Sequence, residues 1–71
     1  AALFEALRAW RAESARERNV PAYVIFPDRT LRAIAEARPA DLAAVATIPG
    51  VGAKKLADFG ESVLRIVAQA N

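Results

Sequence analysis

The feature that most constrains the fold is that only one stretch of the chain, residues 20–26, has the composition of a β-strand. This VPAYVIF run is rich in β-branched and aromatic residues, and no second run of this kind is available to pair with it. A lone strand would leave its backbone N–H and C=O groups without partners in a core. We therefore expect an all-α fold, which this run crosses as an extended or single-turn 3₁₀ segment with Tyr23 to Phe26 in the middle of the bundle.

Elsewhere, apolar residues recur at the spacing of amphipathic helices. The pattern predicts five short helices, over residues 1–19, 29–38, 40–50, 53–59 and 61–71. Asp28 is expected to cap the second helix, Gly50 to end the third and Gly60 to break the chain before the fifth, while Leu42 faces inward. Short connections favour one compact bundle packed in sequence order. The side chains predicted to form its core are Leu7, Trp10, Tyr23, Ile25, Leu31, Ile34, Ile48, Leu56 and Val63.

Composition excludes several classes of function. The 71 residues include no Cys and no His, which rules out disulfides, thiol nucleophiles, the usual zinc sites and histidine-based acid–base catalysis. No stretch approaches the roughly 18 consecutive apolar residues of a membrane-spanning helix. Because the sequence does not begin with Met, we expect residues 1–71 to be a single domain of a larger cytoplasmic protein. We expect a monomer with no catalytic activity, cofactor, metal ion or membrane contact of its own.

The charge balance limits any affinity for nucleic acid. The formal net charge is only +2, because ten Lys and Arg residues are opposed by eight Asp and Glu residues. Proteins that bind nucleic acid strongly usually carry a large excess of positive charge on one face. The composition therefore predicts weak binding to DNA at most.

Several stretches together resemble a known family. In order they are Leu3-Phe4, Leu7-Arg8, Arg11, VPAYVIF, DRTL, IPGVGAKKL and Phe59-Gly60, and they span nearly the entire chain. The combination is similar to the HRDC domain, the helicase and RNase D C-terminal module, and is most similar to the HRDC domains of bacterial RecQ DNA helicases. The chain departs from the family at Asp58 and Phe59, where members often have a basic residue and Tyr before the glycine.

The resemblance implies a small domain of orthogonally packed helices, similar to the SAM fold, with no catalytic activity. It also implies weak binding of single-stranded, forked or partial-duplex DNA and modulation of a neighbouring helicase in a nucleoid-associated protein. RNase D remains an alternative parent, although the PAYVIF and PGVG stretches favour a helicase. The apolar signature from Tyr23 to Phe26 implies the fold and not the function.

The IPGVGAKKL stretch has two interpretations, which are compatible. In the first, Gly50 and Gly52 let a phosphate approach the N–H groups at the start of a helix, and Lys54 and Lys55 add positive charge. In the second, Gly50 adopts a left-handed conformation in a helix corner whose Pro49 and Val51 fix the turn. Asp58 follows one turn after the lysines, so we expect any phosphate grip to be weak.

Two arginine pairs are further candidates for phosphate contact, since each pair is spaced by one helical turn. They are Arg29 with Arg32, and Arg8 with Arg11. The alternative is that they are ordinary surface residues, some paired with acids. Trp10 and Phe26 are aromatic enough to stack on a base, but their apolar neighbours favour the core.

Acidic residues suggest a second class of function, a module that docks onto other domains of its own polypeptide and regulates them. Paired carboxylates also suggest metal or glycosidic chemistry, but a chain this short has no room for a cleft and no His. The candidate interdomain residues are Glu13, Glu17, Asp58, Phe59 and Glu61.

Overall fold

Helices account for most of residues 2–70, the part of the chain that the computed structural model describes. They are α1 (Ala2–Arg18), α2 (Ala22–Ile25), α3 (Asp28–Ala37), α4 (Leu42–Ala46) and α5 (Ala53–Ala70). No strand occurs between residues 2 and 70, which confirms the all-α class. Within the same range, no helix is both long and apolar enough to cross a membrane.

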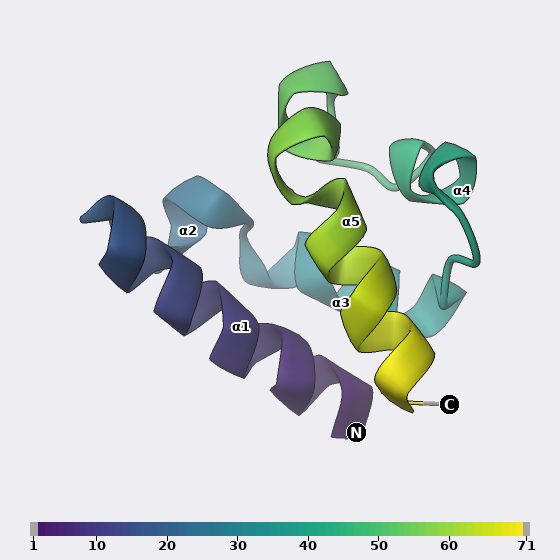
Figure 1. Ribbon diagram of the computed structural model, residues 1–71, viewed down its shortest axis with the longest axis horizontal. Helices are drawn as coiled ribbons and strands as arrows, with labels where there is room; N and C mark the ends of the chain where they lie inside the picture. Colours follow the sequence, from purple (N-terminus) through teal and green to yellow (C-terminus); the bar gives the residue numbers. More distant parts are fainter. Residues whose placement is uncertain (1, 71) are drawn as a thin grey trace.

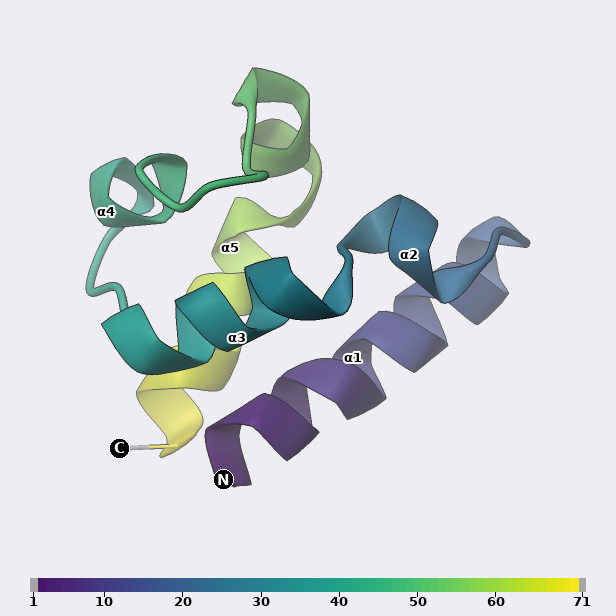
Figure 2. The ribbon, with the colours of Figure 1, turned by 180° about the vertical axis from the view of Figure 1, so that it is seen from behind.

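The three long helices α1, α3 and α5 form the body of the molecule. α1 packs against α2, α3 and α5, while α4 packs against α5. Figure 1 shows α5 in front of α3, and Figure 2 shows α3 in front when the molecule is turned around. The first turn of α1 and the last turn of α5 lie at the same end of the molecule, where Ala2 and Ala70 line one shallow groove.

The core forms where these helices meet. Six of the nine predicted core residues are buried: Leu7, Ile25, Leu31, Ile34, Ile48 and Val63. Trp10 and Leu56 are partly buried against them. Trp10, Phe26 and Phe59 pack ring against ring, with centroids 5.7 to 6.1 Å apart. Phe26 and Trp10 are therefore parts of the interior, as their apolar neighbours indicated.

The middle of the VPAYVIF run, Ala22–Ile25, is a single turn of α-helix, α2. It is not the extended or 3₁₀ segment that we expected. Ile25 and Phe26 are buried as predicted, but Tyr23 is 70% exposed and Val24 is 40% exposed. Successive residues on a helix point about 100° apart, so one short turn cannot send four consecutive side chains inward. The prediction that Tyr23 belongs to the core is wrong.

The predicted break at Gly60 is also wrong, because α5 is one continuous helix of 18 residues that includes Gly60. Gly60 is buried, and a Cβ atom there would lie 2.9 Å from Leu42 Cδ2 and 3.1 Å from Leu56 Cδ1. The glycine thus serves close packing between α4 and α5, and not a break. Leu42, expected to face inward, covers this position while remaining 40% exposed.

The predicted helix ends also need correction. α3 begins at Asp28 itself, after Pro27, and the Asp28 carboxylate pairs with Arg11 of α1 instead of capping the helix. A side-chain cap occurs instead at Asp41, whose carboxylate accepts the Ala44 N–H at 2.8 Å. The helix predicted over residues 40–50 is α4, which ends at Ala46, so Gly50 belongs to the turn that follows it.

Candidate nucleic-acid interface

The first half of the turn between α4 and α5 is a structural corner. Ile48 and Val51 are buried, and the Val51 N–H donates to the Ile48 carbonyl at 3.0 Å. Gly50 has a φ of +93°, which L side chains rarely adopt, so its expected left-handed conformation is confirmed. The Thr30 hydroxyl of α3 donates to the Pro49 carbonyl at 3.3 Å, and a Cβ on Gly50 would lie 2.4 Å from that hydroxyl oxygen. Gly50 is therefore required by the packing of the turn against α3.

The second half of the turn is open. No atom lies within 4 Å of the position that a Cβ on Gly52 would occupy. The Gly52 carbonyl accepts the Leu56 N–H at 2.9 Å, so Gly52 immediately precedes the first turn of α5. The N–H groups of a first helical turn have no partner within the helix, and they sit at the positive end of its dipole. Gly52 thus leaves room for an anion where the backbone favours one.

The two lysines diverge, as adjacent residues on a helix must. The Lys54 side chain is 88% exposed, and its Nζ lies 3.2 Å from Asp58 Oδ2. Lys55 turns toward α2, where its Nζ donates to the Val24 carbonyl. The Lys55 Nζ also lies 5.8 Å and 5.7 Å from the ring centroids of Phe26 and Phe59. Only Lys54 points outward beside Gly52, and its charge is offset by Asp58.

A hollow of about 450 Å³ lies between α2, the end of α1 and the start of α5. We call it the corner groove, lined by Arg18, Val20, Val24, Ile25, Lys54, Lys55, Asp58 and Phe59. The Arg18 guanidinium carbon lies 4.6 Å from the Phe59 ring centroid. Tyr23, next to the lining residue Val24, is largely exposed. The groove therefore combines three cations and one carboxylate with an exposed aromatic ring close by in the chain.

Arg18 and Tyr23 are the residues that sequence reasoning missed. Arg18 follows Leu7 by eleven residues, which is close to three helical turns, so it lies on the same side of α1 as Leu7, although Arg18 itself is exposed. Helical periodicity places Arg18 on that side of α1, but it does not give the contact of Arg18 with Phe59. Nothing comparable marks Tyr23, because its exposure depends on the single-turn geometry of α2.

Arg11 is not available for phosphate contact, so the interpretation of Arg8 and Arg11 as a phosphate-binding pair is wrong. The Arg11 side chain is buried, and its Nη1 lies 2.8 Å from both Asp28 Oδ1 and the Phe26 carbonyl oxygen. The hydrogen bond from Arg11 lowers the pKa of the Asp28 carboxyl below its ordinary value, against a smaller opposing effect of desolvation. The charges of Arg32 and Arg8 lower this pKa further. This cluster joins α1 to α3.

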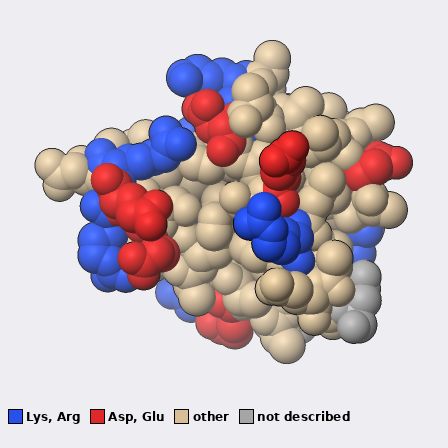
Figure 3. Space-filling view, in the orientation of Figure 1, with Lys and Arg blue, Asp and Glu red and all other residues tan. Residues whose placement is uncertain are grey.

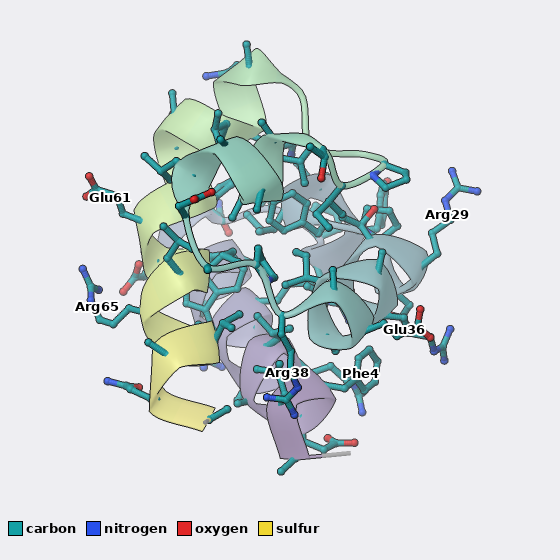
Figure 4. All side chains as sticks on the ribbon, turned by 90° about the vertical axis from the view of Figure 1, so that its right-hand side faces the viewer. Phe4, Arg29, Glu36, Arg38, Glu61 and Arg65 are labelled. Carbon is teal, nitrogen blue, oxygen red and sulfur yellow. The ribbon has the colours of Figure 1, made fainter. Side chains whose placement is uncertain are left out.

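The other predicted arginines lie apart from the corner groove. Arg29 projects away from the body of the molecule on α3 (Figure 4). Arg32 leans over the Phe4 ring of α1, with its guanidinium carbon 5.3 Å from the centroid. The structure therefore does not bring Arg29 and Arg32 together with Lys54 and Lys55 in one groove.

The acidic candidates are scattered. Glu13 is paired with Arg16 at 2.9 Å, and Glu17 is exposed on the same helix. Glu61 is exposed on α5, whereas the Phe59 ring is 6% exposed and thus supports the groove from beneath. Figure 3 shows positive and negative side chains interspersed over this face of the molecule. Between residues 2 and 70, no group of three or more carboxylates is placed to hold a metal ion.

Comparisons with known proteins agree with the all-helical fold. A family model described as the HRDC domain matches residues 1–67. The chain is 56% identical over 61 residues to the ATP-dependent DNA helicase UvrD2 of Mycobacterium tuberculosis, covering 86% of this chain and 9% of that protein. It is 39% identical over 67 residues to the ATP-dependent DNA helicase RecQ of Pasteurella multocida, covering 94% of this chain and 11% of that protein. The chain thus spans about a tenth of the length of these curated relatives.

Two solved structures share the fold. HRDC domain 3 of Deinococcus radiodurans RecQ aligns with a TM-score of 0.92 and 38% identity, covering 96% of this chain and 90% of that one. The solution structure of the HRDC1 domain of RecQ helicase from the same organism aligns with a TM-score of 0.66 and 51% identity, covering 99% and 93%.

Proposed function

The chain belongs to the HRDC domain family, the non-catalytic accessory domains of RecQ- and UvrD-type helicases, and we propose that it binds single-stranded DNA weakly at the corner groove. Through this contact it modulates how a neighbouring helicase binds DNA and which DNA structures it prefers. The domain acts as a monomer on DNA in the cytoplasm. The curated relatives reported above are helicases, which favours a helicase parent over RNase D.

The observation that carries this proposal is the corner groove itself. Arg18, Lys54 and Lys55 all line it, next to the open first turn of α5, where Gly52 leaves room for a phosphate. The exposed ring of Tyr23 offers a face on which a base can stack. Single-strand binding sites combine these two elements, positive charge for the backbone and aromatic rings for the bases.

The same geometry accounts for weak binding. Lys54 shares its charge with Asp58, and Lys55 is already hydrogen-bonded to the Val24 carbonyl. Only a few phosphates can then be neutralised, so the logarithm of the affinity should fall with the logarithm of the salt concentration by a small slope. A slope of about −1 to −2 is expected for one to three phosphates on a single strand.

The test is a titration of the chain with labelled single-stranded DNA at two salt concentrations. Tyr23→Ala should weaken binding about tenfold, since a stacked base contributes about 1–3 kcal/mol. Lys55→Ala removes one charge that can neutralise a phosphate and should weaken binding severalfold. Arg65→Ala, which removes an exposed charge about three turns further along α5, is the matched control and should change binding less than twofold. Absence of any binding at low salt, or equal losses in all three variants, would contradict the proposal.

A second candidate function is interdomain regulation with little DNA binding. It is favoured by the local pairing of surface charges, seen at Glu5 with Arg8, Glu13 with Arg16 and Lys54 with Asp58. A mixed surface of this kind suits docking to another protein surface better than a polyanion. Charge reversal at Glu13, Glu17 or Glu61, which lie outside the corner groove, should then alter unwinding by the full-length protein while leaving DNA binding by the isolated chain unchanged.

A further inference from the structure

At the amino-terminal end of α1, the Phe4 ring holds two arginines from different helices. The guanidinium carbon of Arg8, on α1, lies 6.0 Å from the ring centroid, and that of Arg32, on α3, lies 5.3 Å from it. We call these three residues the Phe4 platform. Contact with an aromatic face holds a guanidinium group in place without consuming its hydrogen-bond donors.

The spacing of the platform is fixed from beneath. Buried Arg11, one turn after Arg8, ties α1 to Asp28, one turn before Arg32, and to the Phe26 carbonyl. The two arginines of the platform therefore stand on helices that are joined beside them. A ligand that bridges Arg8 and Arg32 would meet a preorganised pair, so little conformational entropy is lost on binding.

The charges of the two platform arginines are only partly offset by nearby carboxylates. None of the carboxylates between residues 2 and 70 forms an ion pair with Arg32. Glu5 lies 3.6 Å from Arg8, but both side chains are more than half exposed, so this pair is weak. At the corner groove, by contrast, Lys54 is paired and Lys55 is engaged by a backbone carbonyl. Arginine also offers the forked donors that suit a phosphate.

The platform and the corner groove lie at opposite ends of α1. Arg18 of the groove follows Phe4 by 14 residues, which corresponds to about 21 Å along a helix. That distance is about the rise of six base pairs along one strand of a duplex. One DNA molecule with a single-stranded arm and a duplex arm is long enough to contact both.

We propose that the Phe4 platform is a second phosphate-binding site, which takes the backbone of a duplex arm while the corner groove holds the adjoining single strand. This inference rests on the proposed function and deepens it, because it assigns fork recognition to a face that the groove does not include. Glu36 borders the same small hollow as Phe4 and Arg32, and Figure 4 shows Glu36 and Phe4 on the same side of the molecule. Its negative charge opposes a phosphate there.

The test compares a forked DNA with a single strand of the same unpaired sequence. Arg32→Ala should weaken fork binding about tenfold and reduce the salt slope for the fork by about one, while single-strand binding changes less than twofold. Glu36→Gln should strengthen fork binding about threefold, a gain that a purely structural role would not produce. Phe4→Leu keeps an apolar side chain but removes the ring, and should weaken fork binding severalfold with both charges retained.

Controls separate the site from net charge and from folding. Arg65→Ala removes the same charge from α5 and should leave fork binding within twofold of the wild type. Thermal unfolding of each variant identifies any variant that fails to fold. The gain in fork binding expected for Glu36→Gln remains testable even if another variant fails to fold. Equal effects of Arg32→Ala and Arg65→Ala, or equal losses on the fork and the single strand, would overturn the inference.

The experiments distinguish failure of the corner groove from failure of the Phe4 platform. If Lys55→Ala leaves single-strand binding intact while Arg32→Ala weakens the fork, the groove proposal fails and the platform stands. If the reverse holds, the platform fails alone. Unchanged fork binding in Arg32→Ala, with altered unwinding by the full-length protein, would assign the platform to an acidic protein surface and would overturn its role in DNA binding.

Discussion

Gly50 and Gly52 stand two residues apart in one turn, yet their surroundings are opposite. Gly50 has a positive φ and faces the Thr30 hydroxyl so closely that no side chain fits. Gly52 has open space where a side chain would stand. The difference shows that two glycines in one turn can have different roles. Gly50 is needed for packing of the fold, whereas Gly52 leaves the start of a helix accessible.

The largest effect is expected at the packed glycine. Gly50→Ala should lower the free energy of unfolding by about 3 kcal/mol, because it adds a strained backbone conformation to a collision with Thr30. Urea unfolding followed by circular dichroism measures this loss. A change below about 0.5 kcal/mol, the range of ordinary surface substitutions, would break the comparison.

At the open glycine, stability and binding should move in opposite directions. Gly52→Asp supplies a helix-capping carboxylate at the positive end of α5, so the free energy of unfolding should rise by about 0.5 kcal/mol. The same carboxylate repels a phosphate, and affinity for single-stranded DNA should fall about tenfold. Gly52→Asn, a cap without charge, is the matched control and should keep most of the affinity. Equal affinities of the two variants would remove Gly52 from the DNA site.

The contact between Gly50 and α3 can be isolated by a double-mutant cycle. Thr30→Ala removes the hydroxyl that a Cβ on Gly50 would strike, so the cost of Gly50→Ala should be about 1 kcal/mol smaller in the Thr30→Ala background. Chemical denaturation of the four proteins gives the coupling energy. Strict additivity would show that the cost at Gly50 comes from its backbone conformation alone.

The smallest effect concerns pH. The pKa of Asp28 is lowered in the folded chain, so its contribution to stability is present above the ordinary carboxyl range and is lost as the pH falls through the lowered value. Between about pH 6 and pH 2, wild-type stability should decline more steeply than that of Asp28→Asn. Urea midpoints across this range test the difference. Because the Gly50→Ala variant starts with less stability, the same loss on acidification should unfold it at a higher pH than the wild type. Parallel profiles of the wild type and Asp28→Asn would contradict this role.

Much of the fold could be predicted because helical periodicity is a local signal. Leu7, Leu31, Ile34 and Val63 fall on regular stripes and are buried as expected. The errors at Tyr23 and Gly60 have tertiary causes. Only the approach of α4 makes Gly60 a packing position, and only the short length of α2 turns Tyr23 outward.

The candidate site could be predicted only in part, for the same reason. The pairing of Lys54 with Asp58 follows from their spacing of one turn, and the spacing also predicted that their charges offset each other. The contact of Lys55 with Val24 joins residues 31 positions apart, and the approach of Arg18 to Phe59 joins the end of α1 to the interior of α5. No local pattern in the sequence encodes such meetings.

The continuity of α5 has a mechanical consequence. Its 18 residues form a rod of about 27 Å that begins beside Gly52 and ends beside the first turn of α1. Since Gly60 is clamped by Leu42 and Leu56, the rod has no hinge at its only glycine. A DNA strand bound at the corner groove, as we propose, would therefore act on a helix that extends without interruption to the opposite end of the domain.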